Sequence, residues 1–212
     1  TGPLGQGCAN SVGMAISSRW LGAQYNRPNA TLFDFDTYVL CSDGDLMEGV
    51  ASESASLAGH LQLANLCWIY DDNKITIEGE TDLAFSEDVG RRFEGFGWRI
   101  EYVDDANDAS SLSRALHAFK DETEKPTLIV VKSIIGFGAP TKAGSHSSHG
   151  APLGTDEIVG AKEAYGWPTR EAFHVPDGVG KHFQDTMGER GRLANVSWLT
   201  AHQTLASAEP QV

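Results

Sequence analysis

Two stretches decide the fold: residues 38–44 read YVLCSDG, and residues 67–73 read CWIYDDN. In each, an apolar run typical of a buried strand ends in side chains that carry oxygen atoms. Open α/β sheets bind ligands at the carboxyl ends of their strands, so we expect Asp43 and Asn73 to lie close together. Either stretch alone would be ordinary turn chemistry. A carboxylate and an amide together suit Mg²⁺, so we interpret the pair as a metal–diphosphate site.

Composition narrows the class of protein. The chain has 212 residues, 41% of them hydrophobic, which suits one α/β domain with a full core. Its net charge of −13 repels phosphate backbones and anionic lipids, so neither nucleic acid nor a membrane is an expected partner. No apolar run approaches the roughly 18 residues of a membrane helix. Cys8, Cys41 and Cys67 are well separated in apolar surroundings, which predicts reduced core cysteines and a cytoplasmic protein.

Apolar runs alternate with helical patterns along most of the chain. Because the strands are continuously apolar, we predict an α/β fold with a mostly parallel sheet and helices on both faces. In the helix expected at residues 46–61, Val50, Leu57, Ala58 and Leu61 should face inward. The expected strands are residues 38–41, 66–70, 98–103 and 126–131, and the expected helices are residues 5–21, 46–61, 86–96, 108–119, 156–165 and 177–193.

Residues 134–152 are predicted to form a long loop, because four glycines interrupt them. Loops of this length are usually functional or disordered. Within it, His146 and His149 are three positions apart, which fits either a metal pair or two solvated side chains, and His149 could contact phosphate or relay a proton. Residues 201–212 are small and polar, and we expect them to be disordered.

Two further motifs admit more than one interpretation. Asp45 and Glu48 have the spacing of a capping box at a helix start, but Glu48 could equally join Glu53 in a proton network. The run GPLGQG at residues 2–7 has the wrong glycine order for a dinucleotide fingerprint, which disfavours a nicotinamide-binding domain. A loop that opens a helix and presents backbone amides to a ligand fits this run better.

As a set, these motifs resemble transketolase, a family of thiamine diphosphate (ThDP) enzymes. The resemblance extends from residue 1 to about residue 173. Ser42 stands where the family motif has a glycine, whereas Asp43 and Gly44 match it. The matching motifs, in the family's order and spacing, are GPLGQG (2–7), DGDLMEG (43–49), SLAGHL (56–61), YDDNKI (70–75) and GSHSSHGAPL (144–153).

The resemblance implies a role for each matched position. Asp43, Asn73 and the Ile75 carbonyl would hold Mg²⁺ or Ca²⁺. His149 would be catalytic and would face the substrate. Glu48 would lie at a homodimer interface near the partner's cofactor. The residues that would line ThDP are Gly2, Pro3, Leu4, Gly44, Glu48, Asn73, Ile135 and His149.

The resemblance also implies an organisation and an activity. The chain would be a piece of a longer polypeptide, with an incomplete ThDP- and Mg²⁺-binding domain at residues 1–165 and an extension toward a pyrimidine-binding domain at residues 166–212. The whole enzyme would transfer a two-carbon ketol unit from a ketose phosphate to an aldose phosphate, and this chain alone would be inactive. The alternatives are a related ThDP enzyme such as dihydroxyacetone synthase, and a non-catalytic domain that keeps the fold.

Overall fold

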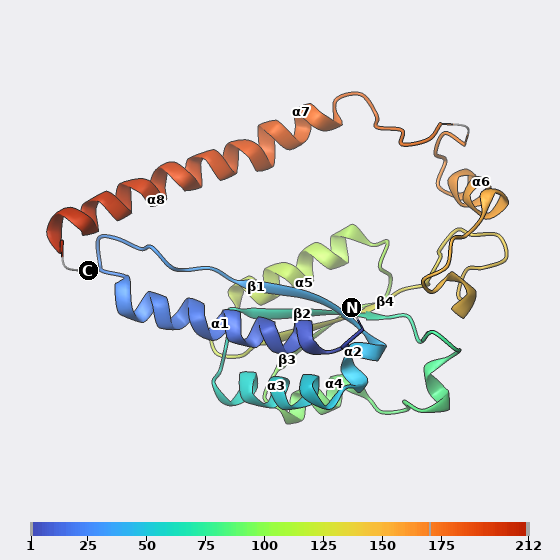
Figure 1. The fold of residues 1–212 in the computed structure, drawn as a ribbon, viewed down its shortest axis with the longest axis horizontal. Helices are drawn as coiled ribbons and strands as arrows, with labels where there is room; N and C mark the ends of the chain where they lie inside the picture. Colours follow the sequence, from blue (N-terminus) through green and yellow to red (C-terminus); the bar gives the residue numbers. More distant parts are fainter. Residues whose placement is uncertain (1, 170, 211–212) are drawn as a thin grey trace. The chain divides into compact units, whose positions relative to one another are not determined.

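A parallel sheet of four strands organises the computed structural model, which describes residues 2–169 and 171–210 (Figure 1). The strand order is β1-β2-β4-β3, and every neighbouring pair is parallel. Each strand overlaps a strand expected from the sequence, so the expected α/β fold is confirmed. The strands are β1 Thr37–Ser42, β2 Leu66–Asp72, β3 Arg99–Val103 and β4 Thr127–Lys132.

Contacts divide the chain into two compact units. The first contains residues 1–16 and 36–169, and the second contains residues 17–35 and 170–212. Four residues of the expected domains lie outside the described residues: Thr1, Arg170, Gln211 and Val212. The domain division at residue 165 stays a prediction. Within the described ranges, no helix is both long and apolar enough to cross a membrane.

Helices cover both faces of the sheet. The first half of α1 (Gln6–Tyr25), α3 (Gly49–His60) and α4 (Val89–Gly95) pack on one face around Trp68, and α5 (Ala109–Asp121) packs on the other (Figure 1). The inner face of α5 is apolar, and its side chains join Cys67, Ile129 and Val131 in one cluster. These α5 side chains are Leu112, Ala115, Leu116 and Phe119.

The helix expected at residues 46–61 differs from the prediction in two ways. It is divided, because Glu48 ends α2 (Asp43–Met47) and precedes α3. The predicted inward face is also wrong at three of its four positions: Val50, Leu57 and Leu61 are 41%, 46% and 40% exposed. Only Ala58 is buried as expected.

Small residues explain which side of α3 faces the sheet. Ala51, Ala55 and Ala58 are the buried positions of α3, and they pack in the cluster that contains Trp68 and Trp98. The Trp98 indole donates a hydrogen bond of 2.8 Å to the Ala55 carbonyl. Large aromatic rings already fill the interior here, so the helix can approach only with its alanines.

The C-terminal prediction also needs correction. Residues 201–208, expected to be disordered, belong to α8 (Glu189–Ala208), which follows α7 (Val179–Phe183) and a π-helical turn at Gln184–Gly188. Leu205 is buried, and Glu209 forms a bidentate ion pair with Arg27 at 2.8 Å. The contacts that order this segment come from residues far away in sequence, which composition does not reveal. The structure places α6 at Thr155–Ala164, as expected.

We predict that Gly59→Ala destabilises the protein. A Cβ at this position would lie 1.8 Å from the Phe96 carbonyl oxygen, so α3 and the segment after α4 would have to separate. Overpacking of this kind costs about 1–3 kcal/mol or more, which denaturant unfolding would measure. The matched control is Gly13→Ala in α1, where a Cβ meets nothing within 4 Å. That change should be neutral or stabilise by about 0.4–1 kcal/mol, and equal midpoints for both variants would contradict the packing argument.

Candidate functional site

The parallel register of β1 and β2 brings the two polar stretches together. Ser42 pairs with Asp71, so Asp43 and Asn73 both leave the sheet at its carboxyl edge. Ser42, which replaces the family's glycine, has extended backbone (φ −132°) that any residue adopts. Its hydroxyl donates a hydrogen bond of 3.0 Å to the Asp71 carbonyl. Serine therefore joins the two strand ends.

Asp43 is completely buried at the start of α2. Its Oδ1 accepts a hydrogen bond of 2.6 Å from the Tyr70 hydroxyl, and its Oδ2 accepts one of 3.2 Å from the Lys74 backbone N–H. Burial raises the pKa of the Asp43 carboxyl, the Tyr70 hydrogen bond lowers it, and the nearby charge of Asp72 raises it again. Burial, together with Asp43, keeps the pKa of the Tyr70 phenol far above its ordinary value, so the phenol stays a donor.

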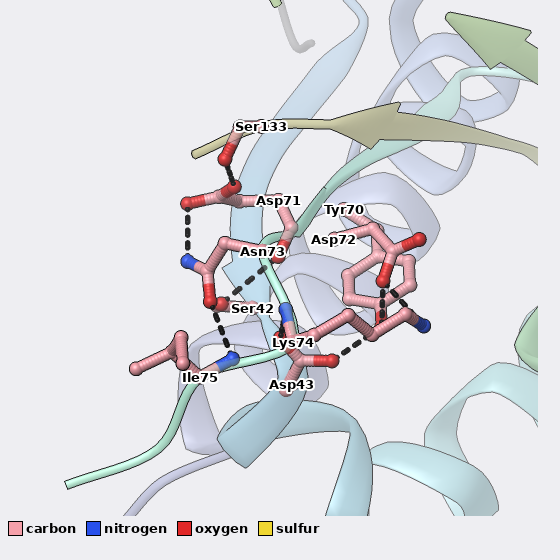
Figure 2. Close-up of polar contacts among 9 residues, drawn as sticks. All are labelled: Ser42, Asp43, Tyr70, Asp71, Asp72, Asn73, Lys74, Ile75 and Ser133. Atoms are coloured by element: carbon pink, nitrogen blue, oxygen red, sulfur yellow. Dashed lines mark hydrogen bonds and ion pairs between the residues drawn. The ribbon is translucent and has the colours of Figure 1, made fainter. Parts of the chain in front are cut away.

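Asn73 is held by its neighbours at the end of β2 (Figure 2). Its Nδ2 donates to Asp71 Oδ2 at 3.1 Å, and its Oδ1 accepts from the Ile75 N–H at 2.9 Å. Lys74 between them adopts a left-handed backbone (φ 62°), a conformation that costs of order 1–3 kcal/mol outside glycine. The Lys74 ammonium pairs with Asp72 at 2.6 Å, and in the described part of the chain it forms no ion pair with Asp43.

A cleft of about 550 Å³ opens beside this strand edge. It brings together residues from four separate segments: the glycine-rich loop, α2, the turn after β2 and the long loop. His149 comes from the long loop, and His146 does not line the cleft. The lining residues are Leu4, Ser42, Gly44, Asp45, Met47, Glu48, Ile75, Thr76, Ile77, Glu78 and His149.

The structure does not bring every predicted residue to the cleft. The predicted residues that do not line it are Gly2, Pro3, Asp43, Asn73 and Ile135. Ile135 lies in the long loop, where its carbonyl accepts from the Gly144 N–H at 2.8 Å.

Of the two interpretations of Asp45 and Glu48, the capping box is wrong. Asp45 instead accepts from the Ser42 N–H at 3.1 Å and from the Gly5 N–H at 2.9 Å, so it ties the glycine-rich loop to α2. Glu48 makes no side-chain cap, and both Glu48 and Glu53 are exposed.

Sequence reasoning gave no role to Tyr70, Asp71 or Ser133, which hold Asp43 and Asn73 in place. Side chains alternate between the two faces of a strand, so Tyr70 and Asp72 of β2 lie on the same face. This alternation could have identified Tyr70 as a residue close to the polar end of the strand. Ser133 follows a different strand and carries no such signal. Its position depends on β4 lying beside β2.

The donor set fits a hard cation. Asp43 is a buried carboxylate for which the described residues provide no Lys, Arg or His ion pair, and a bound cation would compensate its charge. Among residues 2–169 and 171–210, no three His, Cys, Asp or Glu side chains lie close enough to hold a metal by themselves. Any cation here would therefore need amide and carbonyl oxygens, which Mg²⁺ accepts, and it would share phosphate oxygens as well.

Comparisons with known proteins agree on one family. The profile described as "Transketolase, thiamine diphosphate binding domain" matches residues 1–212. The transketolase of Geobacillus stearothermophilus is 47% identical over 212 residues, which are 100% of this chain and 32% of that protein. The transketolase of Bacillus subtilis is 49% identical over 198 residues, 93% of this chain and 30% of that protein.

The same family is found among solved structures. A transketolase from Pichia stipitis in complex with sedoheptulose 7-phosphate superposes with a TM-score of 0.94 at 42% identity, covering 100% of this chain and 31% of that one. The chain thus spans about a third of the length of the curated relatives it matches.

Because the Asp43 carboxylate is buried, we predict that its charge lowers the free energy of unfolding of the metal-free protein, and that this effect depends on pH. Because folding raises the pKa of this carboxyl, its contribution to stability is present below its ordinary pKa and is lost as the pH rises through the raised value. We therefore expect Asp43→Asn to be more stable than wild type at pH 7, by about 0.5–2 kcal/mol. The gain should shrink as the pH falls toward about 4.

An amide can occupy the site of Asp43 and keep both of its hydrogen bonds. Its oxygen would face the Lys74 N–H, and its NH₂ would face the Tyr70 oxygen, whose proton can turn to Asp72 Oδ1 at 3.0 Å. Thermal unfolding with a chelator present, across pH 4–8, would measure the difference. Glu163→Gln, at an exposed carboxylate on α6, is the control and should show no such trend. A destabilised Asp43→Asn variant at pH 7 would contradict the argument.

Proposed function

The chain belongs to the transketolase family of thiamine diphosphate-binding domains, and on that premise we propose that it supplies the cation- and diphosphate-binding half of a transketolase active site. The observation that carries the proposal is the cleft formed by Leu4, Gly44, Ile75 and His149 beside the buried carboxylate of Asp43. The fold and the resemblance predicted from the sequence are both confirmed. The activity, substrates and partners of the whole enzyme are part of the proposal.

In this proposal Asp43, Asn73 and the Ile75 carbonyl hold a divalent cation, Mg²⁺ or Ca²⁺. Asp43 has one hydrogen-bond donor on each oxygen, which leaves further lone pairs for a metal. Bound ThDP would supply the carbanion chemistry of ketol transfer. The protein would bind the diphosphate through the cation and position the rest of the cofactor beside Gly2, Pro3, Leu4, Gly44, Glu48, Asn73, Ile135 and His149.

His149 is the proposed catalytic residue. It is exposed and lines the cleft together with Ile75 and Thr76, whereas His146 three positions earlier does not line it. From this place an imidazole can hydrogen-bond a phosphate or move a proton at a substrate hydroxyl. The Pichia stipitis relative was solved with sedoheptulose 7-phosphate, and by extension we propose ketose and aldose phosphates as substrates of this protein.

A homodimer is the proposed assembly. Val50 and Leu57 of α3, with Leu61 directly after it, form an exposed apolar stripe at helical spacing, and Glu48 and Glu53 are also exposed. Apolar residues exposed along one helix face are typical of an interface. We also propose a reducing, cytoplasmic location, which the three buried free cysteines support. Burial raises the pKa of the Cys67 thiol to about 12, so it stays protonated and unreactive.

The direct test of the cation site is Asp43→Ala in the full-length protein. It removes the only carboxylate of the proposed ligand set, so Mg²⁺-dependent ThDP binding should be lost in calorimetry. Asp72→Ala is the comparison, because it removes a neighbouring carboxylate that is not a proposed ligand, and it should bind ThDP far more tightly than Asp43→Ala. Unchanged ThDP affinity in Asp43→Ala would refute the cation site.

For His149 we predict that His149→Ala lowers turnover of ketol transfer roughly 10²-fold or more, the scale of lost general acid–base catalysis. Thermal stability should change little, because the side chain is exposed. His146→Ala, in the same loop but away from the cleft, is the matched control and should keep near wild-type turnover. If His149→Ala turned over within a factor of about two of wild type, His149 would be a solvated loop residue.

A further inference from the structure

The orientation of the Asn73 amide decides whether it can bind a cation at all. Its oxygen is a ligand for Mg²⁺, and its NH₂ group is not. The two ends of an amide are nearly equal in size, so sterics alone do not select between them. The neighbouring hydrogen-bonding groups must make the choice.

Two contacts select one orientation of Asn73, and they agree. The acceptor-only carboxylate of Asp71 faces Nδ2 at 3.1 Å, and the donor N–H of Ile75 faces Oδ1 at 2.9 Å. Rotating the amide by 180° would set an oxygen against the Asp71 carboxylate and an NH₂ against an N–H. Both hydrogen bonds would be replaced by repulsive pairs, so the flipped state is strongly disfavoured. The second lone pair of Oδ1 stays available to a cation.

Asp71 is itself held from both neighbouring strands (Figure 2). The Ser133 hydroxyl, just beyond β4, donates to Asp71 Oδ1, and the Ser42 hydroxyl, at the end of β1, donates to the Asp71 carbonyl at 3.0 Å. Asp71 is solvent-exposed, so its position depends on these hydrogen bonds and not on burial.

We infer that Asp71 is a positioning residue for the cation site: held by Ser133 and Ser42, it keeps the oxygen of Asn73 directed to the metal. The inference rests on the proposed function, because it takes Asn73 as a ligand. Asp71 acts on the metal through Asn73 and not as a ligand. The chief competing explanation is that the negative charge of Asp71 attracts the cation from a distance.

The test is a double-mutant cycle on the full-length protein, read as Mn²⁺ affinity by electron paramagnetic resonance at saturating ThDP. Asp71→Ala should weaken Mn²⁺ binding roughly 10–100-fold, the usual effect of losing a residue that orients a ligand. In an Asn73→Ala background the same change should have almost no further effect. Ser133→Ala, which removes one of the groups that hold Asp71, should give a smaller loss of affinity.

Asp71→Asn separates positioning from charge. An asparagine oxygen can still accept from Asn73 Nδ2, and its NH₂ can donate to the Ser133 oxygen, so the geometry is kept while the charge is lost. We expect this variant to bind Mn²⁺ within a few-fold of wild type. Circular dichroism and thermal unfolding confirm that each variant is folded.

The outcomes are distinct. If Asp71→Asn lost as much affinity as Asp71→Ala, charge would be the cause and the positioning role would be refuted. An equal effect of Asp71→Ala in both backgrounds would refute it too, because Asp71 would then act independently of Asn73. If Asn73→Ala weakened Mn²⁺ binding and Asp71→Ala did not, only this inference would fail. If Asn73→Ala itself had no effect, the proposed ligand set would fall together with the inference.

Discussion

The parallel pairing of β1 with β2 is the constraint on which the rest of the structure depends. Because Ser42 lies opposite Asp71, the buried carboxylate of Asp43 and the amide of Asn73 leave the sheet at one edge. A slip of one residue would turn every side chain of a strand to the opposite face. It would then place Trp68 and Tyr70 away from the cluster formed by α1, α3 and α4. The packing of the large apolar core therefore determines the geometry of the polar site.

The strand edge contains features that oppose stability. Asp43 is a carboxylate without exposure, and Lys74 has a left-handed backbone. Sites of this kind persist when the surrounding structure determines them from several directions. Here Tyr70 and the Lys74 N–H hold Asp43, and Asp45 joins α2 to the glycine-rich loop through the Gly5 N–H. These contacts leave a buried charge in place, which the proposed cation would neutralise.

The long loop is ordered by its own polar contacts. Glu157, in the first turn of α6, accepts hydrogen bonds from the Thr141 and Lys142 N–H groups and from the Thr141 hydroxyl. These bonds lower the pKa of the Glu157 carboxyl, with the Thr141 hydroxyl contributing most. Lys142 in turn donates to the Leu153 carbonyl at 2.8 Å. The segment that carries His149 is thus closed at its base by residues on either side of it.

The sequence by itself determined the fold class, the four strands and the placement of Asp43 and Asn73 at the same edge of the sheet, because strand patterns and polar strand ends are local. It also separated the glycine-rich loop from a dinucleotide fingerprint, since glycine spacing is local. It did not determine which face of α3 is buried. There the tertiary structure decided, because the rings of Trp68 and Trp98 leave room only for Ala51, Ala55 and Ala58. The sequence also could not identify Ser133 as a partner of Asp71, or show that residues 201–208 form a helix. Both depend on contacts between segments distant in the chain, which no local pattern encodes.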